Sequence, residues 1–114
     1  MPFQLVPPNE VRRVQYTYVL LSEADGRFYI GATSNLRKRL GLHTAGRVPS
    51  TGFRRPLKLI YYEGCLNADD AYRRERYLKS GRGGRYLRAR LASSLAGIKR
   101  PQVGTALARP GESR

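Results

Sequence analysis

Two segments rich in β-branched and aromatic residues, separated by only four residues, constrain the fold of this sequence most. Residues 14–22 (VQYTYVLLS) and 27–31 (RFYIG) have the composition of β-strands, and residues 23–26 (EADG) form a turn sequence. Strands joined by so short a connection pair in antiparallel fashion. The sequence therefore predicts a β-hairpin near the N-terminus, on which the rest of the chain has to pack.

The segment after the hairpin predicts a helix, a loop and a third strand. Ser34 or Asn35 can cap the helix, and Gly46 can end it. Residues 46–56 predict a loop, and residues 57–64 (LKLIYYEG) predict a strand.

The next segments predict two more helices. Asn67 can cap a helix that runs to about Lys79. Residues 80–85 (SGRGGR) predict a glycine-rich break, and residues 86–97 (YLRARLASSLAG) predict a last helix with a leucine ridge. The element order β-β-α-β-α-α predicts an α+β domain in which helices flank a three-stranded antiparallel sheet.

Composition divides the chain into a folded domain with two irregular ends. The 114 residues suffice for one domain with a modest core. Residues 1–13 are rich in proline and predict an irregular arm. Residues 97–114 combine glycine, proline and charge without periodicity and predict a flexible basic tail. The folded domain is expected at 14–96.

The charge of the chain favours a polyanionic partner. The formal net charge is +14, from 22 Lys and Arg against 8 Asp and Glu. Nucleic acid is the first candidate, since neutralised phosphates release condensed counterions, and an anionic membrane surface is the second. Cys65 is the single cysteine, which excludes an intrachain disulfide, and we expect a buried inert thiol. Short apolar runs and the lack of a secretory signal predict a cytoplasmic protein that does not span a membrane.

The first predicted helix places a cation and an imidazole on its inner face. Leu36, Arg39, Leu40 and His43 follow the spacing i, i+3, i+4 and i+7, so they share one face. A lone histidine more often holds a structural hydrogen bond than a catalytic role, and both interpretations stay open for His43.

Glu75 falls on the apolar face of the helix that follows Asn67. It shares that face with Ala71 and Leu78. A carboxylate directed at a core is costly unless it is paired or coordinates a cation. Glu75 either pairs with one of the arginines or binds a lone Mg²⁺ that keeps several waters.

Tyrosines on the hairpin complete a possible reaction centre. Tyr16 and Tyr18 share one face of the first strand, because strand side chains alternate, and Tyr29 comes from the second strand. Each could be a packing residue. Alternatively, a phenol whose pKa is depressed by cations can take a proton from water, while an arginine stabilises charge on phosphorus.

These segments resemble the GIY-YIG nuclease family over about residues 14–90. YTY (16–18) stands where the family has Gly-Ile-Tyr, and YIG (29–31) is intact. TSNLRKRLGLHTAG (33–46) is similar to the family's arginine helix, and AYRRERYLK (71–79) to the segment with the metal-binding glutamate. The chain looks most like the small, stand-alone, single-domain bacterial members. Ala32 occupies a position where the excision-repair branch has a lysine.

The resemblance implies a Mg²⁺- or Mn²⁺-dependent endonuclease that hydrolyses DNA phosphodiesters with one metal ion and no small-molecule cofactor. Tyr18 and Tyr29 would be the paired tyrosines, and which one is the general base stays open. Arg39 would contact the scissile phosphate, Glu75 would bind the metal, and His43 would assist the base or the phosphate. Repair or recombination, on branched or damaged DNA, is the expected setting.

A set of basic residues outside this centre is expected to bind nucleic acid, with Arg54 and Arg55 as surface arginines. The set is Arg37, Lys38, Arg47, Arg54, Arg55, Lys79 and Arg82. Two alternatives remain: a non-catalytic nucleic-acid-binding module on the same fold, and an arginine-rich structural protein on ribosomal RNA.

Overall fold

The computed structural model describes residues 13–98, and within them the predicted α+β architecture is confirmed. One antiparallel sheet has the strand order β2-β1-β3. The strands are β1 (Gln15–Ser22), β2 (Phe28–Thr33) and β3 (Leu57–Cys65). The helices are α2 (Leu36–Thr44), α3 (Pro49–Gly52), α4 (Ala68–Lys79), α5 (Gly81–Arg90) and α6 (Ala92–Ala96).

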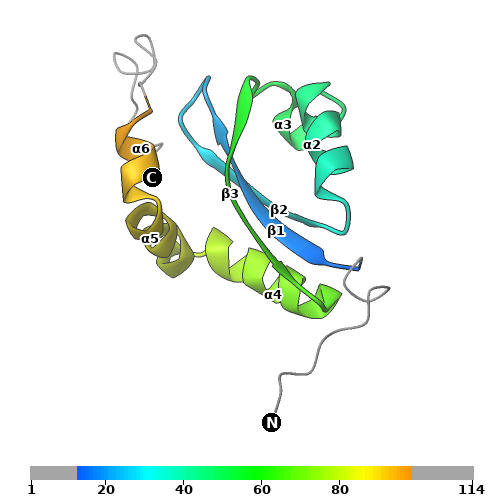
Figure 1. Cartoon of the computed structure of the whole chain (residues 1–114). Helices are drawn as coiled ribbons and strands as arrows, with labels where there is room; N and C mark the ends of the chain where they lie inside the picture. Colours follow the sequence, from blue (N-terminus) through cyan, green and yellow to red (C-terminus); the bar gives the residue numbers. More distant parts are fainter. Residues whose placement is uncertain (1–12, 99–114) are drawn as a thin grey trace.

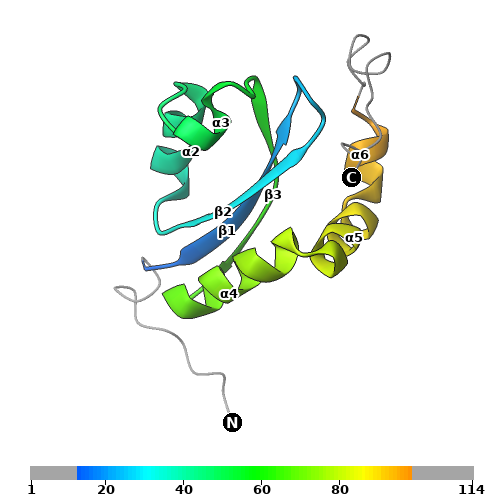
Figure 2. The same ribbon diagram turned by 180° about the vertical axis from the view of Figure 1, so that it is seen from behind.

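Helices cover the sheet from both sides. In Figure 1, α2 and α3 lie on one side of the strands, while α5 and α6 lie on the other and α4 crosses the end of the sheet. Figure 2 shows the same arrangement from behind, where β2 is the strand nearest the viewer. The two sides of the sheet therefore face different helices. Successive side chains of β1 point alternately to one side and to the other.

The apolar core lies on the side of α4 and α5. Val19 and Ile30 pack there against Leu78, Leu87 and Leu91, and all five side chains are buried. The hydroxyl of Thr17, also on β1, donates to the carbonyl of Ala71 at 3.2 Å. This buried bond anchors α4 to the central strand.

The glycine-rich stretch 80–85 is not a break, and that prediction is wrong. Ser80 caps α5, because its side chain accepts a hydrogen bond from the amide of Gly83, and the helix runs from Gly81 to Arg90. A Cβ on Gly83 would collide with the backbone of Tyr77 and Leu78. The glycine therefore permits α5 to pack tightly onto the end of α4.

Three smaller expectations also need correction. The predicted loop 46–56 contains the short helix α3. The last helix is two helices, because α5 ends and α6 begins at Leu91. Cys65 is half-buried rather than buried, and its thiol contacts the carbonyl of Asn67.

The expected arm and tail fall almost entirely outside the described residues. Of the segments 1–13 and 97–114, the structure describes only Arg13, Gly97 and Ile98. Within residues 13–98, no helix is both long enough and apolar enough to cross a membrane.

Candidate active site

Helix α2 directs one basic face at the sheet, as its periodicity predicts. Asn35 caps the helix by accepting a hydrogen bond from the amide of Lys38 at 3.0 Å. His43 is buried and Arg39 is partly buried, whereas Arg37 is exposed. The cap and the spacing together fix which side chains reach the strands.

His43 joins β1 to α3 through both ring nitrogens. Its Nε2 lies 2.8 Å from the hydroxyl of Tyr18, and its Nδ1 lies 2.8 Å from the hydroxyl of Thr51. All three side chains are buried, with at most 1% of their surface exposed. This connected set is called the Tyr18–His43–Thr51 chain below.

Tyr29 from β2 completes an aromatic cluster with Tyr18 and His43. The ring centroids of Tyr29 and His43 are 5.0 Å apart, and those of Tyr18 and Tyr29 are 6.3 Å apart. Tyr29 is only partly buried, in contrast to Tyr18. The two phenols therefore lie side by side, but only Tyr29 is open to solvent.

Gly31 leaves the space that the Tyr18 ring occupies. The two residues are opposite each other in the β1–β2 register. A Cβ on Gly31 would lie 2.5 Å from the Tyr18 hydroxyl oxygen, which is closer than any real contact allows. The glycine of the YIG sequence is therefore a packing requirement of the phenol beside it.

Burial controls the titration of Tyr18. It raises the pKa of Tyr18 to about 12, and the charges of Tyr29 and Glu75 add to the rise, while a hydrogen bond and the charge from Arg39 oppose it. The alternative of a phenol whose pKa is depressed by cations therefore does not apply to Tyr18, because burial outweighs the lowering by Arg39. At neutral pH this phenol keeps its proton.

The pKa values of Arg39 and His43, the two groups next to Tyr18, are shifted in opposite directions. Hydrogen bonding to Tyr18 is the main cause that raises the pKa of Arg39, so its guanidinium stays charged. Burial, and then the charge of Arg39, lower the pKa of His43. The imidazole is therefore neutral at neutral pH.

Glu75, on α4, is the carboxylate whose charge acts on this centre. Only 19% of its side chain is exposed, and its negative charge acts on the Tyr18 phenol. Its Oε2 lies 2.8 Å from Nζ of Lys79, one turn further along the helix. Glu75 therefore has an ion-pair partner, which is a lysine rather than one of the arginines considered from the sequence.

The other partly buried glutamate, Glu63, belongs to a separate structural cluster. Arg74 donates to both of its carboxylate oxygens, at 2.7 and 3.3 Å, and the Tyr61 hydroxyl donates to Oε1 at 2.9 Å. The Arg74 guanidinium also lies 5.0 Å from the ring centroid of Tyr86. With all of these partners satisfied, Glu63 holds β3 to α4 and α5.

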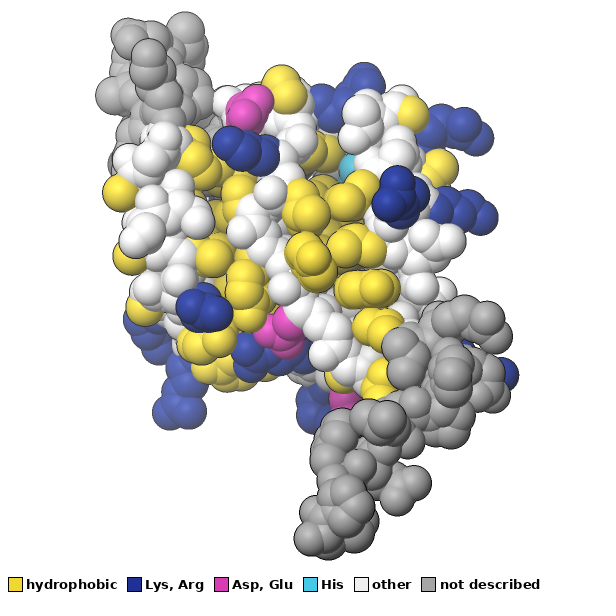
Figure 3. Space-filling model, in the orientation of Figure 1, with side chains coloured by type: hydrophobic (Ala, Val, Ile, Leu, Met, Phe, Trp, Pro, Cys, Tyr) yellow, Lys and Arg dark blue, Asp and Glu magenta, His cyan; other side chains and the backbone are white. Residues whose placement is uncertain are grey.

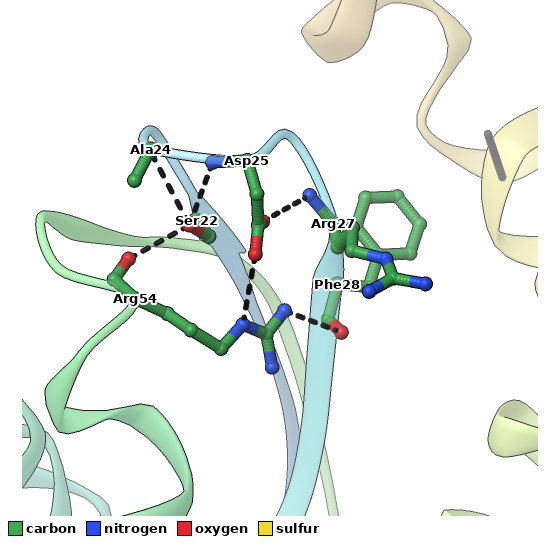
Figure 4. Close-up of polar contacts among 6 residues, drawn as sticks. All are labelled: Ser22, Ala24, Asp25, Arg27, Phe28 and Arg54. Carbon is green, nitrogen blue, oxygen red and sulfur yellow. Dashed lines mark hydrogen bonds and ion pairs between the residues drawn. The ribbon is translucent and has the colours of Figure 1, made fainter. Parts of the chain in front are cut away.

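Arg54 is not a surface arginine, contrary to expectation. Only 15% of its side chain is exposed, and Figure 4 shows it folded against the hairpin turn. Its Nε donates to Asp25 at 3.3 Å and its Nη2 to the carbonyl of Phe28 at 3.2 Å, while its own carbonyl accepts from Ser22 at 2.7 Å. Arg54 thus ties the loop before β3 to the β1–β2 turn.

The six other basic residues expected to bind nucleic acid all lie at the surface. Arg55 is exposed, although its guanidinium donates to the carbonyls of Gly52 and Thr44. In Figure 3, Lys and Arg side chains surround a face whose centre is apolar. The exposed members of the expected set are Arg37, Lys38, Arg47, Arg55, Lys79 and Arg82.

Thr51 is the site residue that sequence reasoning missed. It lies in the sequence VPSTG (48–52), which has neither periodicity nor a recognisable motif. Its contact with His43 arises only because α3 folds back beside α2. The other close partnership, Glu75 with Lys79, had a visible signal in the spacing of four residues on a predicted helix.

Comparison with known proteins identifies relatives of this chain. It is 42% identical over 65 residues to a UPF0213 protein of Streptococcus pneumoniae serotype 4, covering 56% of this chain and 65% of that protein. It is 37% identical over 68 residues to one of Lacticaseibacillus paracasei, covering 59% and 75%. It is 39% identical over 67 residues to one of Clostridium perfringens, covering 58% and 71%. The chain thus spans just under two thirds of the Streptococcus protein.

The solved structures contain no significant match to this chain. The family model described as "GIY-YIG catalytic domain" matches residues 14–86, which are most of the residues that the structure describes. Those residues include Tyr18, Tyr29, the inner face of α2 and Glu75. The chain therefore belongs to the GIY-YIG nuclease family.

Proposed function

We propose that this protein is an endonuclease that hydrolyses phosphodiester bonds in DNA with the help of one divalent cation. The observation that carries the proposal is the gathering of Tyr29, Arg39 and Glu75 around the buried Tyr18–His43–Thr51 chain. Phosphodiester hydrolysis needs a group that takes a proton from water, a cation at the phosphate and an anionic ligand for a metal. These three side chains offer one of each.

The donor set fits Mg²⁺ or Mn²⁺ better than a metal that needs several protein ligands. Within residues 13–98, no three His, Cys, Asp or Glu side chains cluster closely enough to hold a metal. Mg²⁺ commonly takes one or two carboxylates and keeps waters or substrate phosphate oxygens as its other ligands. Glu75 would hold the ion, which when bound supplies polarisation of the phosphate and assistance to the leaving oxygen.

Arg39 contacts the scissile phosphate in this proposal. Its guanidinium lies beside both phenols and remains charged at any working pH. A fixed cation at this place stabilises the negative charge that builds up as water adds to phosphorus. Lysine would be a poorer substitute, because the planar guanidinium can bind two phosphate oxygens at once.

The burial difference between the two tyrosines assigns them different tasks. Tyr29, which is partly exposed, can meet the attacking water and, as the phenolate, accept its proton. Tyr18, which is fully buried and has a raised pKa, keeps its own proton and donates it in a hydrogen bond to neutral His43. Tyr18 and His43 are then positioning residues for Arg39 and Tyr29.

DNA is the substrate that charge and family favour, and repair or recombination is the setting we propose. The net charge of +14 suits a polyanion. The second candidate, a non-catalytic binding module, is favoured by the Glu75–Lys79 ion pair, because a paired carboxylate has a structural role without any metal. The two candidates differ in whether removing the Glu75 charge affects cleavage.

The decisive experiment is a cleavage panel run with Glu75→Gln beside the wild type. Duplex, flap, fork and single-stranded oligonucleotides are incubated with Mg²⁺ or Mn²⁺. Glu75→Gln should lose cleavage and keep DNA binding, since only the carboxylate charge is removed. Asp69→Asn, an exposed carboxylate on the same helix, is the matched control and should cleave normally. Full cleavage by Glu75→Gln, or none by the wild type on any substrate, favours the binding module.

A further inference from the structure

We propose that a pocket beside Tyr29 binds one unpaired nucleotide of the DNA substrate. This inference rests on the proposed function and concerns which DNA the site prefers. The pocket has a volume of about 280 Å³ and lies between β2 and the junction of α4 with α5. Its lining includes Phe28, Tyr29, Ile30, Lys79, Ser80 and Arg88.

The wall formed by β2 suits the face of a base. Phe28 and Ile30 supply aromatic and apolar surface on the side of α4 and α5, whereas the ring of Tyr29, between them on the strand, lies beside His43. The guanidinium carbon of Arg88 lies over the Phe28 ring, 5.9 Å from its centroid. Unpaired bases are commonly held against aromatic rings and guanidinium planes, because every base has a π face.

The charge of the pocket suits a phosphate and disfavours a cation. Two of its lining residues, Lys79 and Arg88, are basic, and none of them is acidic. The nearest carboxylate partner of Lys79 is Glu75, on the side of the reaction centre. A ligand with an aromatic part and an anionic part matches this distribution, and a nucleotide has both.

Size and position narrow the ligand to a single nucleotide next to the cleaved bond. Pockets for small ligands commonly measure about 300–1,000 Å³, so one of about 280 Å³ is too small for two nucleotides. Tyr29 belongs both to the pocket and to the reaction centre. A base stacked inside a duplex cannot enter a concave pocket, so the nucleotide has to be unpaired or flipped out.

The test compares two labelled duplexes that differ by one extra nucleotide. Fluorescence anisotropy measures binding of the full chain to a matched duplex and to the same duplex with a single-nucleotide bulge, without divalent cations. The bulged duplex should bind about tenfold more tightly, which is the order of effect of stacking one base on an aromatic side chain. A 2-aminopurine in the bulge should change its emission on binding.

Two variants of the pocket should abolish this preference. Phe28→Leu keeps an apolar side chain but removes the ring, and Arg88→Lys keeps the charge but removes the guanidinium plane. The control is Arg85→Ala, at an exposed arginine of α5 outside the pocket. This variant should weaken the binding of both duplexes by the same factor. Equal binding of both duplexes by the wild type, or an unchanged preference in both pocket variants, would overturn the inference.

Failure of this inference is distinguishable from failure of the proposed function. Cleavage without a preference for the bulged duplex would contradict the nucleotide pocket and still support the nuclease. The opposite result is also informative. If the wild type cleaves no substrate but prefers the bulged duplex, and Phe28→Leu and Arg88→Lys lose that preference, the pocket is supported and the nuclease is contradicted. Thermal unfolding of each variant shows whether it is folded, and Arg88→Lys provides the test if Phe28→Leu unfolds.

Discussion

The Tyr18 hydroxyl is one end of a hydrogen-bonded chain that fixes the tautomer of His43. Arg39 can only donate to the Tyr18 oxygen, so the Tyr18 proton is directed at Nε2 of His43. Nδ1 then carries the histidine proton and donates it to Thr51, whose hydroxyl makes a long contact of 3.5 Å with the carbonyl of Val48. In this one arrangement, every polar group of the Tyr18–His43–Thr51 chain has a hydrogen-bond partner.

Replacing Thr51 by valine should remove the hydrogen-bond acceptor of Nδ1–H while Tyr18 still holds the tautomer of His43. Valine has nearly the same shape but accepts no hydrogen bond, so the Nδ1–H of His43 would be buried without a partner. The free energy of unfolding should fall by about 1–3 kcal/mol. Because His43 is the single histidine of the chain, long-range ¹⁵N NMR reads its tautomer directly. Thr44→Val, at an exposed position, is the control, and an Nε2–H tautomer in the wild type or in Thr51→Val would contradict the assignment.

The lowered pKa of His43 predicts acid sensitivity in a narrow range. Below the ordinary value of 6.5 the unfolded chain takes up a proton that the folded protein refuses until a lower pH. The free energy of unfolding should therefore be fully maintained above pH 6.5 and decline as the pH falls towards the folded pKa. Urea unfolding at pH 7.5 and 5.5 measures the decline. In His43→Gln the free energy of unfolding should decline less between these two pH values than in the wild type. An equal decline in both proteins would mean that other groups cause it.

At the scale of elements, helix α4 presents a carboxylate that already has a cation. Lys79 should compete with a metal for Glu75, because its ammonium lies 2.8 Å from Oε2. Lys79→Met should therefore bind Mn²⁺ about two to five times more tightly, as expected for a half-exposed ion pair. Electron paramagnetic resonance titration without DNA measures free Mn²⁺. Arg76→Met, on the same helix, should leave the affinity unchanged, and an unchanged affinity in Lys79→Met would show that the pair does not compete.

The junction of α4 with α5 depends on a single glycine. Gly83→Ala would place a methyl group against the backbone of Tyr77 and Leu78, and should lower the free energy of unfolding by about 1–3 kcal/mol. Gly84→Ala meets nothing closer than 3.7 Å, and should stabilise α5 by about 0.5–1 kcal/mol. Chemical denaturation of both variants measures the difference. Equal effects of the two substitutions would mean that the close packing at Gly83 is not limiting.

Local signals predicted the elements that local interactions define. Asn35 and Asn67 cap the helices that their positions predict, and periodicity places Arg39 and Glu75 on inner faces. The start of α5 could not be predicted, because the low helix propensity of glycine is overridden by packing at Gly83.

In the candidate site, too, the sequence predicted only what local interactions define. Its members on regular elements follow from spacing, whereas Thr51 enters through a tertiary contact between α3 and α2. The full burial of Tyr18 could not be predicted from the sequence either, and it is burial that raises the pKa of this phenol.

At the scale of the whole molecule, the net charge of +14 is the property that DNA would meet first. Each phosphate contact releases counterions, so binding should weaken steeply with salt. About six contacts would reduce the affinity on the order of a thousandfold between 50 and 200 mM salt. A flat salt profile would argue against any nucleic-acid partner, whatever the chemistry of the site.

Arg37 and Arg54 form a matched pair that separates binding charge from structural charge. Arg37 is exposed on α2, so Arg37→Ala should reduce the magnitude of the salt slope by about one and leave thermal stability nearly unchanged. Arg54 is held by Asp25 and by the carbonyl of Phe28, so Arg54→Ala should leave the slope unchanged and lower the melting temperature. Anisotropy titrations at several salt concentrations, with thermal unfolding of the same samples, measure both quantities. If the two arginines exchanged these roles, DNA would have to approach over the hairpin turn rather than over α2, and the reaction centre would lie outside the path of the bound strand.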